Sequence, residues 1–176
     1  MRRVLLLLLL CSSFVMAQDK DKPDKWEPLR FFVGQWHGQV SGMPGNGTGE
    51  REYKFILGDN YLHCVNKAVF KPQDKNPKGE VHEDWMFFSF DAGRKKHVMR
   101  QFNIEGFTNQ FVIDSVSFDG KTIVMTTEYV ENGPPGTKAR YILMITGDDE
   151  FTEIFELAFS GKELKECLKN NWTRKK

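Results

Sequence analysis

Gly34-Gln35-Trp36 opens the first strand-like segment of this chain, directly after a short apolar turn at residues 28–33. Glycine at position 34 permits the sharp change of direction that a strand needs after such a turn. From here to Arg174, near the end of the 176 residues, apolar and polar residues alternate and are interrupted by turn-forming residues. This pattern is typical of β-hairpins and predicts about ten strands.

One hairpin is specified more closely than the others. Asp59-Asn60 is expected to form a two-residue turn, because Asn and Asp tolerate the left-handed backbone that such turns require. The side chains on one face of this hairpin are mostly apolar, whereas the other face carries charged residues, so the apolar face is expected to point inward. The predicted cross-strand pairs are Leu57 with Leu62, Phe55 with Cys64 and Tyr53 with Asn66.

Ten strands joined by short turns leave unpaired edges, and closing the sheet removes them. We therefore predict an all-β fold, a closed antiparallel barrel with a short N-terminal helical plug formed by residues 28–33. A sandwich of two sheets is the alternative, because the strand pattern alone does not separate the two architectures. Residues 162–170 are the least certain strand, since their Glu, Lys and Leu content also suits a short helix.

The N-terminal residues have the pattern of a signal peptide. Arg2 and Arg3 precede an apolar run, and Ala17 is a small residue at a suitable cleavage position. The run is shorter than the roughly 20 apolar residues that a transmembrane helix needs. A lipidated Cys11 is the alternative, and Leu10 disfavours it, because the residue before a lipidated cysteine is normally small. We expect a signal peptide at 1–17, a disordered charged leader at 18–28, a barrel domain at 29–176, no membrane span, and export to the periplasm or the extracellular space.

Charge and motifs exclude several classes of function. With 25 basic and 24 acidic residues, the chain offers no electrostatic reason to bind nucleic acid. No Gly-x-Ser-x-Gly elbow, phosphate loop or dinucleotide fingerprint occurs, so the sequence gives no evidence for an enzyme. No closely spaced Cys/His pairs predict a zinc site. Cys64 and Cys167 either form a disulfide or are two separate buried thiols, and the sequence does not decide between these states. The sequence does not fix the oligomeric state.

Polar side chains at positions where a closed core prefers aliphatic residues are the main functional signal. Arg51, Tyr53 and Asn66 share the predicted lumen face, and a buried guanidinium must meet a carboxylate, water or an anionic group of a ligand. The sequence leaves two explanations for these polar residues. They form either an internal network with Glu83, Asp84 or Asp114 or a ligand site. The predicted ligand-binding residues are Arg51, Tyr53, Asn66, Trp85 and Arg100.

Several motifs resemble the lipocalin-like (calycin) superfamily, and within it the nitrobindin-like branch and its exported bacterial relatives of unknown function. The resemblance implies structural roles for Gly34, Trp36 and Arg174, with the indole closing one barrel end and the guanidinium packed over it. It also implies a small molecule held in the lumen. The motifs are Phe32-x-Gly34-x-Trp36-x-Gly38, the hairpin at 57–62, and the stretches at 76–85 and 100–107.

The resemblance raises one cofactor, haem, which nitrobindins bind through a histidine late in the barrel. This chain has no histidine after His97, so only His82 is a candidate haem or metal ligand. We expect no cofactor and a non-catalytic exported barrel that binds a small, mostly apolar or amphipathic molecule. An anionic or hydrogen-bonding head would be recognised by Arg51, Arg100 or Asn66. The alternatives are a haem protein acting on reactive nitrogen species and a structural barrel with a filled lumen.

Overall fold

The structure is a computed structural model and describes residues 24–176. The predicted signal peptide and most of the predicted leader lie outside the described residues. The elements are α1 (Glu27–Arg30), β1 (Gly34–Gly42), β2 (Gly45–Ile56), β3 (Tyr61–Phe70), β4 (Glu80–Asp91), β5 (Lys96–Asn103), β6 (Thr108–Val116), β7 (Thr122–Glu131), β8 (Lys138–Gly147), β9 (Glu150–Ala158) and β10 (Lys165–Arg174).

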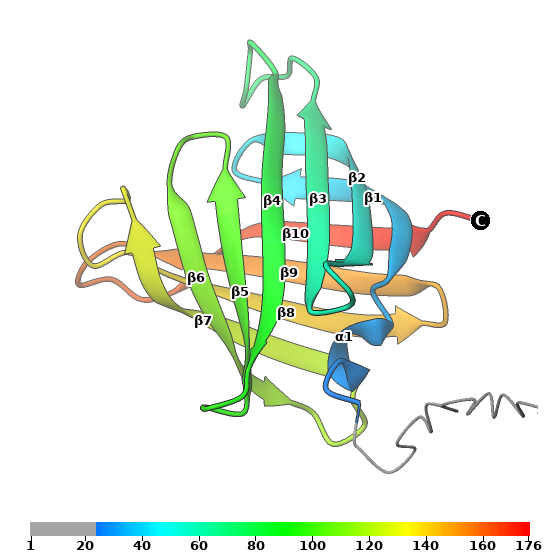
Figure 1. Ribbon diagram of the computed structural model, residues 1–176. Coiled ribbons are helices and arrows are strands. Elements are labelled where there is room, and N and C mark those ends of the chain that lie inside the picture. The colour runs from blue at the N-terminus through cyan, green and yellow to red at the C-terminus, as the bar shows by residue number, and fades with distance from the viewer. Residues whose placement is uncertain (1–23) are drawn as a thin grey trace, which may run out of the picture.

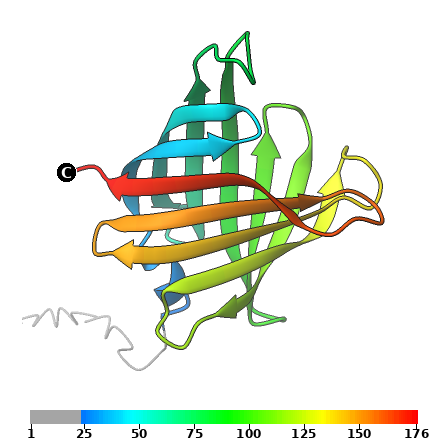
Figure 2. The same ribbon diagram turned by 180° about the vertical axis from the view of Figure 1, so that it is seen from behind.

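The strands form a closed antiparallel barrel, as predicted, and the two-sheet alternative is excluded. Each strand pairs with its neighbours in sequence, and β1 pairs with β10 to complete the ring (Figure 1). The closing pair runs from Trp36 opposite Arg174 to Gly42 opposite Leu168. Closure leaves no free sheet edge. Seen from behind, the last strands lie directly beside the first ones (Figure 2).

The best-determined hairpin has the predicted faces but a different register. Phe55 lies opposite Leu62 and Tyr53 opposite Cys64, so all three predicted pairs are wrong by two residues, namely Leu57–Leu62, Phe55–Cys64 and Tyr53–Asn66. The cause is a longer turn, in which Leu57 and Asp59 both adopt positive φ, at 52° and 61°. A shift of two residues keeps every side chain on its face, so the inward assignment survives.

A short helix closes one end of the barrel, as predicted. The helix α1 carries Leu29 into the core, and Phe32 follows it. Trp26 is only 2% exposed and its indole donates to the backbone oxygen of Asp59 at 3.0 Å. Burial of a side chain as large as an indole stabilises the plug. The folded domain therefore begins before Leu29, and Trp26 does not belong to a disordered leader.

The three residues with implied structural roles meet beside the plug. The Arg174 guanidinium lies 4.2 Å from the centre of a Trp36 ring. It also donates to the backbone oxygens of Phe31 and Val33, both at 2.7 Å. Gly34 has φ of 122°, and a Cβ there would lie 3.2 Å from the same guanidinium. Arg174 thus ties the last strand to the turn that precedes the first.

Two further details complete the fold. The region 165–174 is a strand, so the helix considered for residues 162–170 does not form. Within the described chain, Cys64 is a buried free thiol and Cys167 a partly buried one, with no disulfide between them. Residues 24–176 contain no helix long and apolar enough to cross a membrane.

Candidate functional site

The interior of the barrel is divided along its axis. The half next to α1, called here the lower compartment, is filled by large buried side chains. Phe32 packs edge-on against Phe151 at 5.0 Å between ring centres, and Phe151 packs against Trp36 at 4.8 Å. This half is a core of rings packed against one another. Its other main members are Tyr53, Leu62, Cys64, Met86, Phe88, Met99, Phe111, Ile123 and Met125.

A layer of buried polar side chains, called here the polar belt, lies directly above the lower compartment. Its members come from eight strands and are linked by hydrogen bonds. Many are direct cross-strand neighbours, because a residue that points inward has its partners on both adjacent strands. The belt consists of Arg51, Asn66, Asp84, Gln101, Asn109, Tyr141, Glu153 and Asn170.

An ion pair crosses the belt between β2 and β9. Arg51 donates from both terminal nitrogens to Glu153, at 2.5 and 3.1 Å, and both side chains are almost fully buried. Its guanidinium also lies 4.2 Å from the centre of a Trp172 ring. Burial lowers the pKa of Arg51, and the Glu153 carboxylate more than compensates, so its pKa is raised above the ordinary value. Arg51 therefore stays charged inside the barrel.

The remaining belt residues continue this network around the wall. Asn66 accepts from Arg51 at 3.0 Å and donates to Asp84 at 2.8 Å. Gln101 donates to Asp84 as well and to the Tyr141 hydroxyl at 3.1 Å. Burial raises the pKa of Asp84, but hydrogen bonds from His82 and Gln101 outweigh it and lower the pKa. The belt therefore satisfies its own charges.

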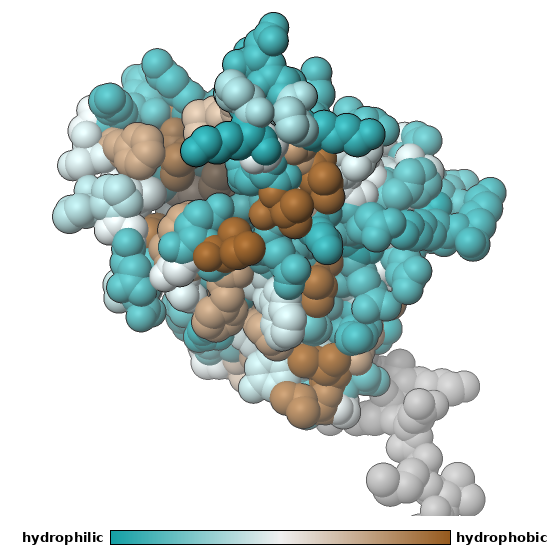
Figure 3. Space-filling model, turned by 90° about the horizontal axis from the view of Figure 1, so that it is seen from above, coloured by the Kyte–Doolittle hydropathy of each residue, from teal (hydrophilic) through white to brown (hydrophobic). Residues whose placement is uncertain are grey.

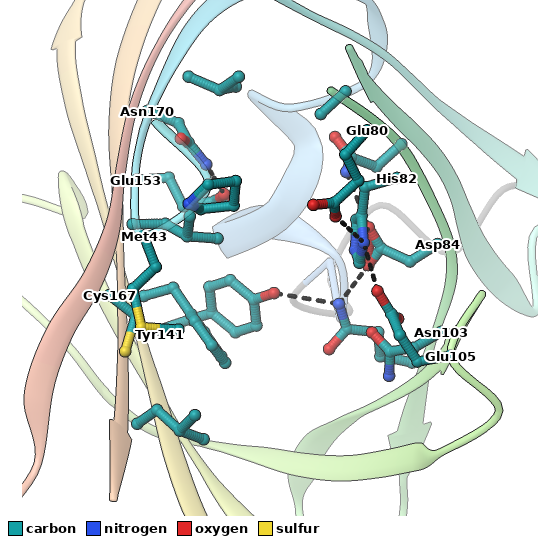
Figure 4. A pocket seen from close by; sticks show the side chains of 18 of the residues that line it. Met43, Glu80, His82, Asp84, Asn103, Glu105, Tyr141, Glu153, Cys167 and Asn170 are labelled. Atoms are coloured by element: carbon teal, nitrogen blue, oxygen red, sulfur yellow. Dashed lines mark hydrogen bonds and ion pairs between the residues drawn. The ribbon is translucent and has the colours of Figure 1, made fainter. Parts of the chain in front are cut away.

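Above the belt lies a cavity of about 210 Å³, called here the upper cavity, which opens at the barrel end opposite α1 (Figure 4). From outside, this end carries mostly hydrophilic side chains with a few hydrophobic ones among them (Figure 3). The cavity floor is the belt. Its apolar wall is formed by Val40, Met43, Pro44, Ala68, Phe70, Phe107, Phe155, Leu157 and Leu168.

One belt atom lacks a partner among the described residues. Asn170 is 5% exposed, and its amide nitrogen donates to Glu153 at 2.9 Å, which fixes the orientation of the amide. Its carbonyl oxygen, Oδ1, is buried without a hydrogen bond. Asn170 lines the upper cavity, so this unpaired acceptor belongs to the layer that forms the cavity floor.

A charged cluster lies at the rim of the cavity, around His82 (Figure 4). Its Nδ1 is 2.8 Å from Glu105 and its Nε2 is 3.5 Å from Asp84. The hydrogen bond to Asp84 is the main cause that raises the pKa of His82 to about 9, against the effect of burial. His82 is therefore an imidazolium at neutral pH, held between carboxylates.

The predicted ligand-binding residues fall into two groups. Arg51 and Asn66 lie in the belt and line the cavity, and the Tyr53 hydroxyl accepts from Arg51 at 3.1 Å from below. Trp85 and Arg100 do not belong with them. Both point outward, Trp85 at 47% exposure, because the register of β4 and β5 puts odd positions of β4 and even positions of β5 outside. This corrects their assignment to the lumen.

The ion pair also has a different partner from those considered in the sequence. Arg51 meets Glu153 and contacts Asp84 only through Asn66, whereas Glu83 and Asp114 lie on the outer face. Glu153 was recognisable, because it is a carboxylate in the inward series Phe151, Glu153, Phe155, Leu157 of one strand. Asn170 and Tyr141 could not be recognised as inward residues in this way, because polar residues also occur on outer faces.

Comparisons with known proteins support the fold. No family model and no curated protein matches the chain. The chain is similar in structure to Rv2717c from M. tuberculosis, with a TM-score of 0.63, 16% identity, and coverage of 89% of this chain and 100% of that one. A weaker likeness, to EF1p2_mFAP2b bound to DFHBI, has a TM-score of 0.46, 7% identity, and coverage of 86% and 100%. The closed ten-strand barrel fits a lipocalin-like (calycin) fold.

Proposed function

We propose that this protein binds a compact amphipathic molecule in the upper cavity, with its apolar body against the wall and a hydrogen-bond-donating or cationic head toward Asn170. The observation that carries the proposal is the buried Asn170 oxygen without a partner, in the polar belt below a cavity with an apolar wall. Leaving such an acceptor unpaired costs free energy, and a donor on a ligand recovers it. The barrel supplies the scaffold and no catalytic group is required.

The charges of the cavity favour this head group over the anionic one expected from the sequence. The ionisable lining residues are four carboxylates and two cations, Arg51 and protonated His82, which leaves a formal charge of −2. Arg51 already satisfies Glu153, so it offers no free positive charge. An anion would meet net repulsion in a partly desolvated site, and a cation net attraction.

Three probes of one shape test this preference. They are para-methylbenzylamine, para-methylbenzyl alcohol and para-toluate, each added to the purified protein and followed by calorimetric titration. We expect the amine to bind at least about tenfold more tightly than the carboxylate, a difference of about 1.4 kcal/mol. If none binds, or if the carboxylate binds best, the proposal is wrong.

A matched pair of variants on one strand locates the binding. Ala68 faces the upper cavity and its neighbour Val69 faces outward. Ala68→Phe fills the cavity and is expected to abolish binding of the amine, whereas Val69→Phe adds similar bulk outside and leaves binding unchanged. Equal binding by both variants would place the ligand elsewhere. Thermal melting of both checks that each remains folded.

A structural barrel with a filled lumen is the second candidate, and the cavity volume favours it. Ligand pockets generally begin at roughly 300 Å³, and this cavity measures about 210 Å³. The belt residues also satisfy one another, apart from the Asn170 oxygen. This alternative treats the small cavity as a packing defect of the barrel, and it predicts that no probe binds and that Ala68→Phe raises the melting temperature by filling that defect.

The residues present do not fit haem, the cofactor implied by the nitrobindin-like branch. A haem needs a pocket that holds the macrocycle against an axial imidazole, and the histidine that lines the cavity, His82, lies at its rim. The cavity is also below the usual size for even a drug-sized ligand. A Soret band on haem titration that is lost in His82→Ala would contradict this.

Export completes the proposal. It rests on the basic start, the apolar run and the small residue of the signal-peptide pattern at residues 1–17. Expression of the full-length chain in a host with a secretory pathway, followed by N-terminal sequencing of the exported product, is expected to give a chain that begins at Gln18. Retention of the intact N-terminus in the cytoplasm would contradict export.

A further inference from the structure

Three side chains at the rim of the upper cavity bring metal-ligand atoms together. Glu80 and His82 lie two positions apart on β4 and so share its inner face. Glu105 reaches them from the turn between β5 and β6. One ligand atom from each residue lies within 4.8 Å of the other two. His82 Nδ1 is 2.8 Å from Glu105 and 3.8 Å from Glu80.

The backbone holds the two carboxylates in place. Glu105 lies in a tight turn in which Gly106 N–H donates to Asn103 O at 2.9 Å, and Gly106 has φ of 88°, a value that glycine adopts without strain. The Asn103 amide also donates to the Phe107 backbone oxygen at 3.1 Å. Glu80 accepts from Asn76 at 3.5 Å. These contacts reduce the freedom that the site would lose on binding an ion.

A buried carboxylate orients the imidazole from the opposite side. Asp84 is 3.5 Å from His82 Nε2, the nitrogen that points away from Glu80 and Glu105. Asp84 is itself fixed in the polar belt by Asn66 and Gln101. Metal-ligating histidines in general have a carboxylate or carbonyl on their second nitrogen, which sets the tautomer and the ring orientation. This arrangement leaves Nδ1 directed at the two exposed carboxylates.

We propose that Glu80, His82 and Glu105 form a binding site for a divalent transition-metal ion, with Zn²⁺ as the reference ion. One imidazole nitrogen and two carboxylate oxygens are a donor set that zinc accepts, at bonds of about 2.0–2.2 Å. Three protein ligands leave a fourth position of a tetrahedral ion open. Because the three residues line the upper cavity, that position faces the cavity.

The spacing agrees with such a site. Tetrahedral donors about 2.1 Å from an ion lie about 3.4 Å from one another, a value derived from the usual bond lengths. The observed contacts of 2.8 and 3.8 Å lie on either side of it. Small side-chain rotations are therefore enough to admit the ion, which would take the place of the His82 Nδ1 proton and of its present contact with Glu105 and would release that proton to solvent.

The ligands were not recognisable as a motif in the sequence. The sequence has no closely spaced Cys/His pairs and so predicted no zinc site, and His82 alone was a candidate haem or metal ligand. Glu105 lies 23 residues from His82. The two meet because the β4–β5 hairpin folds the chain back, so that Asp84 lies opposite Asn103 and the turn after it reaches the rim.

Calorimetric titration of the metal-free protein with Zn²⁺ tests the site. We expect one ion per chain for the wild type, and binding weakened by at least about tenfold in His82→Ala and in Glu105→Gln. Two exposed residues elsewhere give matched controls, His37→Ala and Glu163→Gln, which should bind as the wild type does. Near-UV circular dichroism checks that each variant is folded. If His82→Ala fails to fold, Glu105→Gln still tests the site, because it changes only an exposed side chain.

Cys167 also lines the cavity and requires its own control. Cys167→Ser is expected to leave Zn²⁺ binding unchanged, and Co²⁺ in place of Zn²⁺ should give visible bands without the thiolate charge-transfer absorption. Absence of Zn²⁺ binding, equal binding by the wild type and both ligand variants, or dependence on Cys167 would overturn the proposal. The site is independent of the proposed function, because none of these titrations contains an organic probe.

Discussion

The lower compartment and the upper cavity are built from the same strands, yet one is filled and the other is open. Along β4, inward residues change from Phe88 and Met86 through Asp84 to His82 and Glu80. Along β3 they change from Leu62 through Asn66 to Ala68. The strand period fixes which side chains point inward, and their size and polarity at each level decide whether that level is core or cavity. The polar belt is the boundary between the two.

The largest expected effect concerns the belt itself. Glu153→Ala leaves the Arg51 guanidinium buried without its ion-pair partner and is expected to lower the free energy of unfolding by about 3–5 kcal/mol. The double variant Arg51→Met with Glu153→Leu removes both charges and should recover most of that loss. Urea unfolding monitored by tryptophan fluorescence measures both. A cost below about 1 kcal/mol for Glu153→Ala would show that the boundary is not a buried network.

The next effect compares equal truncations on the two sides of the boundary. Leu62 is completely buried in the lower compartment, whereas Leu157 lines the upper cavity and is partly exposed. Leu62→Ala is expected to cost about 2–5 kcal/mol, since a packed core cannot collapse around the missing atoms. Leu157→Ala should cost less than about 1.5 kcal/mol, because part of its surface is not packed. Equal costs from urea unfolding would mean that the two compartments are packed alike.

The two thiols sharpen the comparison kinetically. Cys64 lies in the lower compartment, where burial raises the pKa of its thiol, and Cys167 lies at the upper cavity. A thiol-specific reagent at pH 8 should modify Cys167 in the native protein at least about a hundredfold faster than Cys64, because the thiolate is the reactive form and Cys64 needs local opening. Mass spectrometry of timed digests measures both rates. Similar rates would show that the lower compartment is accessible.

The smallest effect is expected on the outer face. Arg100 points away from both compartments and donates weakly to Ser89 at 3.4 Å. Arg100→Ala should change the free energy of unfolding by no more than about 0.5 kcal/mol and leave binding of para-methylbenzylamine unchanged. A clear loss of probe affinity, measured by the same calorimetric titration, would return Arg100 to the binding site.

The fold was predictable from the sequence because its signals are local. Alternation between consecutive residues and the turn residues between the alternating segments predicted the strands, and the need to pair the sheet edges predicted the closed barrel. The inward position of Arg51 and Asn66 followed from the faces of one hairpin. That inference survived a register error of two residues, because side chains alternate with a period of two.

The candidate site was only partly predictable because it depends on contacts between distant strands. Arg51 and Glu153 are 102 residues apart, and only barrel closure brings β2 and β9 near each other, with β1 and β10 between them. Trp85 and Arg100 were misplaced because a register uncertain by one residue exchanges the inner and outer faces. Polarity alone gave no such information, since an arginine is polar on either face.

A crystal structure of the protein soaked with para-bromobenzylamine, with the bromine located by anomalous scattering, shows directly whether the upper cavity holds the ligand. We expect one bromine above the polar belt, beside Phe155 and Ala68, with the ammonium group near Asn170 and the lower side chains unmoved. A bromine among Leu62, Phe88 and Phe111, or no bromine anywhere inside the barrel, would contradict it.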